Sequence, residues 1–83
     1  MRVTAIVVNY FTSGFLKPLL SVLSGEPDIS EIVIADNSGE PGLSSLAGGC
    51  GRTRVVSFGG NLGFAAAVNR VAESADAEWF LVI

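Results

Sequence analysis

Three short segments of this sequence carry side chains suited to binding chemistry, and each follows an apolar run. They are Asn9-Tyr10, Asp36-Asn37-Ser38 and Gly59-Gly60-Asn61. The carboxylate of Asp36 can accept hydrogen bonds from a nucleobase imide N–H or a ribose hydroxyl. Tyr10 can stack on a base. Both residues also have a purely structural interpretation, an Asx-turn for Asp36 and a half-buried rim aromatic for Tyr10.

The stretch FGGNLGFAAAVNR, from Phe58 to Arg70, is rich in small residues. Gly63 and the alanines at 65–67 remove side-chain bulk near the expected start of a helix. Free backbone N–H groups at such a start favour an anion such as a diphosphate. The same small residues would also let the helix pack closely against a sheet. The sequence leaves both interpretations open for this stretch.

Apolar runs with β-branched residues predict the strands that would position these segments. The predicted strands are Val3–Val8, Glu31–Ala35, Thr53–Phe58 and Glu78–Ile83. Helical or loop segments separate them, and this alternation is typical of an α/β fold with a parallel sheet. Such sheets bind ligands beyond the carboxyl ends of their strands, where the three polar segments would lie.

The first helix is expected after Asn9-Tyr10, with Ser13 as a candidate cap. Pro18 predicts a regular helix that begins nearer Lys17, because proline suits the first turn. Gly25 is expected to end this helix. Its apolar residues are Phe15, Leu16, Leu19, Leu20, Val22 and Leu23.

Two further helical segments are expected. Leu43–Leu46 reads as a short turn, and Leu62–Ala75 as a helix with Asn61 as its N-cap. The apolar stripe of the longer helix consists of Phe64, Val68, Val71 and Ala75.

Composition excludes several classes of function. The chain of 83 residues has a net charge of -3 and scattered basic residues, which argues against nucleic-acid binding. It lacks histidine, which removes His-based triads and most zinc sites. A spanning apolar run and a signal peptide are also missing, and Cys50 is alone, so we expect a cytoplasmic protein without an internal disulfide. The basic residues are Arg2, Lys17, Arg52, Arg54 and Arg70.

Two common nucleotide and phosphate folds do not fit. A dinucleotide site needs G-x-G-x-x-G in the first strand–helix turn, and that turn here reads NYFTSG. Gly59, Gly60 and Gly63 follow the third strand instead, with a different spacing. A receiver domain would need acidic residues after the first strand, where Asn9-Tyr10 stands.

Three pieces of the sequence, taken in order, resemble the amino-terminal half of a family 2 glycosyltransferase. They are VTAIVVNY, IVIADNS and NLGFAAAVNR, and the similarity covers nearly all 83 residues. The subgroup that it resembles is the bacterial rhamnosyltransferase-like one. Many members have glycine two residues after the helix asparagine, where this chain has Val71.

The resemblance implies the GT-A fold, a Rossmann-like three-layer α/β/α domain with a parallel sheet. Residues 1–83 would be its amino-terminal nucleotide-binding part, so the fold would be incomplete. We predict the strand order 3-2-1-4 with right-handed crossovers. The bare edge of the fourth strand then predicts self-association.

The same resemblance implies transfer of a sugar, with rhamnose as a candidate, from a dTDP or UDP donor to an acceptor hydroxyl. The reaction is usually inverting. The acceptor would be a glycan or a lipid-linked molecule in cell-wall or surface polysaccharide synthesis, at the inner membrane surface or in the cytoplasm. A non-catalytic α/β interaction module is the alternative function.

The resemblance also assigns roles to individual residues. Val8, Asn9 and Tyr10 would line the base, with Tyr10 stacked on it. Asp36 would hydrogen-bond the base, and we predict that it faces an open cleft near Tyr10. Gly63 and the helix through Asn69 would flank the ribose and the diphosphate.

The reacting groups of the family are not assigned in this sequence. In the family, the strand resembling WFLVI leads into an acidic motif that holds Mg²⁺ or Mn²⁺ against the donor diphosphate. That motif and the general base are absent here, so the catalytic residues are unknown and the 83 residues alone are expected to be inactive. Glu73, Asp76 and Glu78 are expected to form a solvated helix end and the approach to the last strand.

Overall fold

The computed structural model describes residues 2–49 and 51–83, so the prediction for Cys50 lies outside the described residues. Strands and helices alternate along the chain, as the sequence predicts. The elements are β1 (Val3–Asn9), α1 (Ser13–Ser24), β2 (Glu31–Asp36), α2 (Leu43–Gly48), β3 (Thr53–Ser57), α3 (Phe64–Ser74) and β4 (Trp79–Val82).

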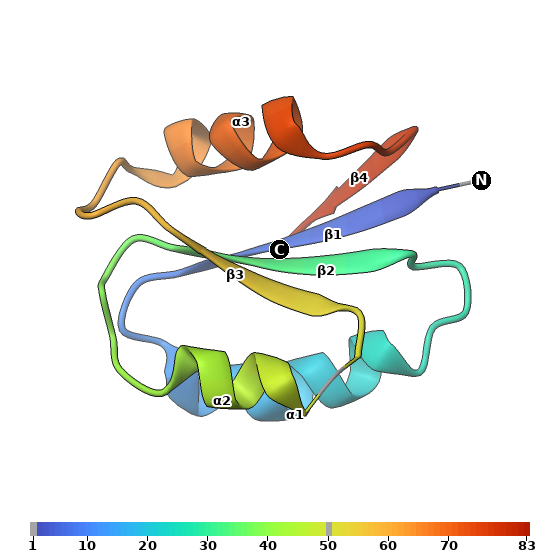
Figure 1. The fold of residues 1–83 in the computed structure, drawn as a ribbon, viewed down its shortest axis with the longest axis horizontal. Helices are drawn as coiled ribbons and strands as arrows, with labels where there is room; N and C mark the ends of the chain where they lie inside the picture. Colours follow the sequence, from blue (N-terminus) through green and yellow to red (C-terminus); the bar gives the residue numbers. More distant parts are fainter. Residues whose placement is uncertain (1, 50) are drawn as a thin grey trace.

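The strands form one parallel sheet in the order β3-β2-β1-β4, which confirms the predicted order. Helices α1 and α2 cover one face and α3 covers the other, so the molecule has three layers (Figure 1). Because β2 is central and covered on both faces, its residues from Ile32 to Asp36 are all buried. This explains why its sequence is a continuous apolar run rather than an alternating one.

Each face of the sheet has its own core. Under α1, the side chains of Leu16, Leu20 and Leu23 are buried against the sheet, at the spacing of one helical stripe. On the other face, Ala67 and Val71 of α3 pack on Ile6 and on β2 residues. The two cores hold β1 and β2 in place, and therefore the loops that follow these strands.

Helix α1 begins at Ser13, so the prediction of a start nearer Lys17 is wrong. Thr12 occupies the N-cap position, and Pro18 lies inside the helix. Proline has no N–H to donate to the carbonyl of Gly14, so one backbone hydrogen bond of the helix is lost. Burial of the three leucines offsets this loss, and the helix continues through the proline.

Helix α3 begins at Phe64 rather than Leu62, and Asn61 is not its N-cap. Gly63 holds that position, and the side-chain oxygen of Asn61 accepts a hydrogen bond from the Gly63 N–H at 2.8 Å. Phe64 is exposed although the sequence places it on the apolar stripe. Phe64 is the first residue of the helix, and the buried residues of this face lie further along it, at Ala67 and Val71.

Strand β4 lies beside β1, as predicted, and borders solvent on its other edge. Arg2 connects the approach to β4 with the start of β1. Its guanidinium pairs with Asp76 at 2.8 Å, and its backbone N–H donates to Glu78 at 3.1 Å. Asp76, Glu78 and Glu73 lie at the end of α3 and on the approach to β4, as the sequence predicts for this segment.

Candidate functional site

The loops after β1, β2 and β3 lie together at the carboxyl edge of the sheet, on the left of Figure 1. The parallel register places Asn9 beside Asp36, and Asp36 beside Ser57. The structure therefore brings the three polar segments of the sequence to one edge. This edge is the usual ligand-binding position in open parallel sheets.

Asn9 is the centre of a buried hydrogen-bond network at this edge, with 0 % of its surface exposed. Its side-chain oxygen accepts from the backbone N–H and the hydroxyl of Thr12, at 3.1 and 2.8 Å. Its amide nitrogen lies 3.1 Å from Asp36, 3.2 Å from Ser38 and 3.3 Å from Glu40. The side chain is thus engaged by the protein itself and holds the β1–α1 loop against the β2–α2 loop.

Asp36 is also buried, with 2 % exposed, so the expectation that it faces an open cleft is wrong. One carboxylate oxygen accepts from the backbone N–H and hydroxyl of Ser38 at 3.0 and 2.7 Å. The other accepts from the N–H of Gly39 at 3.0 Å. This is an Asx-turn, the structural interpretation that the sequence left open.

The environment of Asp36 favours its charged form. Burial raises the pKa of the carboxyl, but hydrogen bonds from the hydroxyl and N–H of Ser38, from Asn9 and from Gly39 outweigh it. The resulting pKa lies below its ordinary value. At neutral pH the edge of the sheet therefore holds a fixed, buried carboxylate.

Glu40 is a second acidic residue in this network that sequence reasoning missed. Besides its contact with Asn9, its carboxylate accepts a hydrogen bond from the hydroxyl of Ser13, at the start of α1. Glu40 lies 27 positions from Ser13 and 31 from Asn9, so no local pattern announces these contacts. Glu40 joins the loop after β2 to the first turn of α1.

Two exposed aromatic residues come directly after Asn9 in the sequence. Tyr10 is 54 % exposed and Phe11 is 63 % exposed, and their rings meet edge to face with centroids 5.0 Å apart. Phe11 has a φ of +55°, an uncommon conformation for a bulky residue. The two rings offer flat apolar surface to a ligand, and the sequence pattern had singled out only Tyr10.

At the start of α3, only one residue of the small-residue stretch packs closely against the sheet. Ala67 is buried against the sheet, whereas the alanines at 65 and 66 are exposed. Gly63 has a φ of +85°, and a Cβ placed on it would meet open space. Backbone conformation therefore explains this glycine, and the space around it is open.

The other two predicted site residues lie at different places. Val8 is partly buried beneath α3 and packs against the core on that face. Asn69 is exposed and lies two positions beyond the buried Ala67, on the side of α3 that is turned away from the sheet. The structure does not bring Asn69 to the edge where Tyr10 and Gly63 lie.

Asn37 belongs to one of the three polar segments, but the sequence pattern assigned it no role of its own. Its side-chain oxygen accepts from the Leu62 N–H at 3.1 Å, and its side-chain nitrogen donates to the Gly63 carbonyl at 3.2 Å. Its backbone N–H donates to the Asn9 carbonyl at 2.9 Å. The ends of β1 and β2 and the loop before α3 are thereby joined.

Comparison with protein families adds to this geometry. The family model described as glycosyl transferase family 2 matches residues 4–83. The chain belongs to this family. A search of curated proteins found no match to the chain. A glycosyl transferase of family 2 binds a nucleotide-sugar donor and an acceptor, so the parallel-strand edge is the candidate donor site.

The described part of this glycosyl transferase offers no ligand set for a divalent cation. Within residues 2–49 and 51–83, no three His, Cys, Asp or Glu side chains gather as a metal site would require. Asp36 and Glu40 are two carboxylates at this edge that share Asn9 as a hydrogen-bond donor. A divalent cation at this edge would need ligands besides these two carboxylates.

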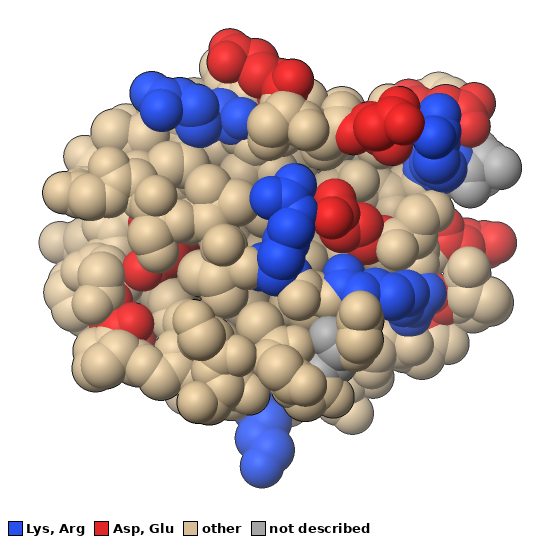
Figure 2. Space-filling model, in the orientation of Figure 1, with Lys and Arg blue, Asp and Glu red and all other residues tan. Residues whose placement is uncertain are grey.

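Charge on the glycosyl transferase surface is dispersed. On the face shown in Figure 2, blue and red side chains alternate with large neutral areas and the blue ones form no continuous stripe. The pair Arg54–Glu31, with 2.8 Å between its charged atoms, is one neutralised example. Among the helices of the described residues, none has the length and apolar character needed to cross a bilayer.

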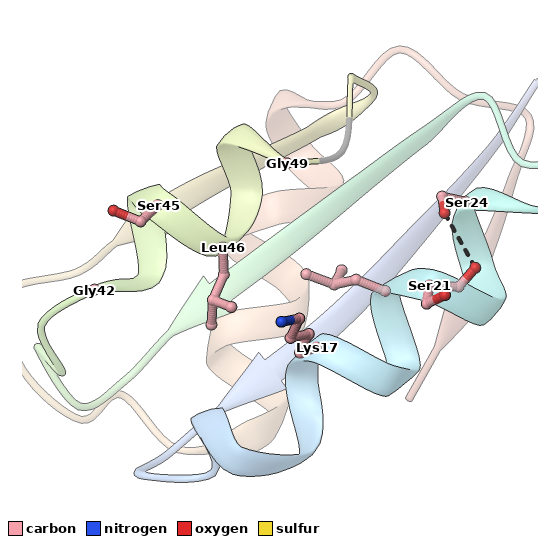
Figure 3. Close-up of a pocket in the computed structure, with 8 residues that line it drawn as sticks. Lys17, Ser21, Ser24, Gly42, Ser45, Leu46 and Gly49 are labelled. Carbon is pink, nitrogen blue, oxygen red and sulfur yellow. Dashed lines mark hydrogen bonds between the residues drawn. The ribbon is translucent and has the colours of Figure 1, made fainter.

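A cavity of about 480 Å³ lies away from the candidate donor site, between α1 and α2 (Figure 3). Leu46 of α2 points towards α1 there, and Lys17 approaches it from α1 (Figure 3). The hydroxyl of Ser24 donates to the carbonyl of Ser21 at 3.1 Å, so that hydroxyl is already engaged. The residues that line this cavity include none of the predicted site residues.

Proposed function

We propose that this glycosyl transferase binds the nucleotide of its donor at the carboxyl edge of β1, β2 and β3. The observation that carries the proposal is the convergence at this edge of exposed Tyr10, the exposed first residues of α3 and a buried hydrogen-bonded network. The aromatic ring suits a base and the helix start suits a diphosphate. The hydrogen bonds between Asn9 and Thr12 hold the loop that carries Tyr10.

In this proposal the base stacks on Tyr10 while Asn9 holds the loop from below. Asp36 selects a uracil or thymine base by accepting the imide N–H. Its Oδ2 atom accepts one hydrogen bond, from Gly39, whereas Oδ1 accepts three. Oδ2 therefore has capacity for one more donor. Because Asp36 is buried, the Ser38–Gly39 turn must shift for the base to reach Oδ2.

The finer identity of the reaction also belongs to the proposal. We infer a dTDP or UDP donor, with rhamnose as a candidate sugar, and inverting transfer to a hydroxyl of a glycan or lipid-linked acceptor in surface polysaccharide synthesis. A cytoplasmic location, or the inner membrane surface, suits such donors. Mg²⁺ or Mn²⁺ would offset charge on the leaving diphosphate. Asn69 has no role in this scheme, because it lies on the side of α3 that is turned away from the sheet.

Thermal unfolding with added nucleotide tests the proposal. UDP or dTDP at about 100 times its Kd should stabilise the chain by about 2.7 kcal/mol, whereas the matched purine nucleotide ADP should do less. Tyr10→Ala should reduce the shift. Phe15→Ala is the matched control, because Phe15 is an exposed aromatic on α1. Absence of any nucleotide-dependent shift would favour the alternative, a non-catalytic α/β interaction module.

A further inference from the structure

Asn37 occupies an unusual position between two candidate ligand-binding loops. Its side chain is 4 % exposed, so it offers little surface to a ligand. The side chain instead bonds to the loop before α3. Its oxygen accepts from the Leu62 N–H, and its nitrogen donates to the Gly63 carbonyl. A two-point contact of this kind fixes the position and the orientation of the dipeptide between them.

The dipeptide Leu62-Gly63 contains a flexible residue, so these two hydrogen bonds restrict its conformation. Gly63 has a φ of +85°, and glycine has more conformational freedom than any other residue. Its carbonyl also accepts the N–H of Ala67 at 3.2 Å, which is a hydrogen bond of the first turn of α3. The Asn37 side chain therefore donates to the same carbonyl that accepts the first-turn hydrogen bond of the helix.

We propose that Asn37 is a positioning residue that holds the start of α3 where the donor diphosphate binds. The inference rests on the proposed function, since it takes the start of α3 as the diphosphate site. The Asn37 backbone N–H is bonded to Asn9, so the side chain reaches out from the anchored end of β2. Asn37 thereby couples the base-binding side of the edge to the diphosphate-binding side without touching either ligand group.

This role gives a signature that a general structural role would not give. Loss of the two hydrogen bonds of the Asn37 side chain should weaken the binding of UDP, because in this proposal its diphosphate binds at the start of α3. It should leave the binding of uridine unchanged, because the Asn9 network beneath the base remains intact. The ratio of the two affinities therefore measures the coupling directly.

The experiment measures Kd by calorimetry for UDP and for uridine on the wild-type chain and on Asn37→Ala. We expect about a tenfold weaker Kd for UDP and a change within about twofold for uridine. Leu62→Pro is the second variant, because it removes the N–H that Asn37 accepts and leaves the Asn37 side chain in place. Glu73→Gln, a change at the far end of α3, is the control.

Amide hydrogen exchange without any ligand supplies an independent readout. The Leu62 N–H should exchange faster in Asn37→Ala, while amides of the central strand β2 keep their protection. Equal loss of UDP and uridine affinity, or no change in either, overturns the inference alone. A wild-type chain that binds neither UDP nor dTDP overturns the proposed function and this inference with it.

Discussion

Asn9 and Asp36 are register partners at the ends of β1 and β2, and their side chains are 3.1 Å apart in a buried hydrogen bond. In a parallel sheet a shift of one residue would turn either side chain to the opposite face. The bond therefore depends on the register, which the apolar residues of both strands set. It links the core directly to the geometry of the two loops above it.

Replacing Asn9 tests the importance of this network. Asn9→Ala removes one hydrogen-bond donor to the Asp36 carboxylate and the side-chain acceptor of the Thr12 N–H. We expect the free energy of unfolding to fall by about 1–3 kcal/mol in urea titration. Asn61→Ala is the control, because Asn61 is exposed and its side chain serves one N–H in the same edge. Equal losses for the two variants would contradict a central role for Asn9.

The lowered pKa of Asp36 predicts how stability changes with pH. A carboxyl whose pKa is lower in the folded state stabilises the fold above its unfolded pKa, which is about 3.9. That contribution is lost as the pH falls through the lower folded pKa. Asp36→Asn should therefore reduce stability at pH 7 and flatten the loss of stability below about pH 4.

Urea titrations of both proteins across this pH range measure the effect. Asp28→Asn is a matched control, because Asp28 is an exposed aspartate in the α1–β2 loop. An unchanged acid slope in Asp36→Asn would show that the hydrogen bonds of the Asx-turn do not favour the charged form.

Gly63→Ala tests whether the start of α3 depends on backbone conformation. A Cβ has room there, but the φ of +85° combined with a ψ of 166° is a backbone conformation that essentially only glycine adopts, so we expect a loss of about 1–3 kcal/mol. Gly60→Ala should have a smaller effect, because Gly60 has equal space and no such positive φ. Thermal unfolding of the two variants compares them. A larger loss for Gly60→Ala would argue against this explanation.

The sequence predicted the sheet better than the helix starts. Strands such as Glu31–Asp36 are buried on both faces, so their apolar runs identify them without knowledge of their partners. Helix starts depend on local hydrogen bonds that several residues can satisfy. Asn61 looked like an N-cap by type, yet its side chain bonds to Gly63 and the helix starts two residues later than predicted.

The sequence predicted that the polar segments meet at one edge of the sheet, but it did not predict the contacts that their side chains make there. The polar strand ends located the edge correctly, because parallel strands end together. The burial of Asp36 could not be predicted, since the segment Asp36–Gly39 suits both a turn and a ligand contact. The contacts of Glu40 with Ser13 and of Asn37 with Gly63 join residues 27 and 26 positions apart, and only the fold brings them together.

The outer edge of β4 carries the last prediction. Trp79 to Ile83 are consecutive apolar residues, each 39–62 % exposed, on a strand whose other edge pairs with β1. An exposed apolar strand edge readily pairs with another chain. We therefore expect the 83-residue chain to self-associate in solution, with a mass by light scattering that rises with concentration.

A charged substitution on this strand distinguishes association through the β4 edge from association through other exposed apolar residues. Leu81→Lys should reduce the association, because an edge lysine opposes strand pairing. Val22→Lys is the control, since Val22 is an exposed apolar residue on α1, outside the sheet that β4 borders. If Val22→Lys reduced the association as strongly as Leu81→Lys, the contact would not be at β4. A monomeric chain at all concentrations would show that the β4 edge does not pair with a second copy.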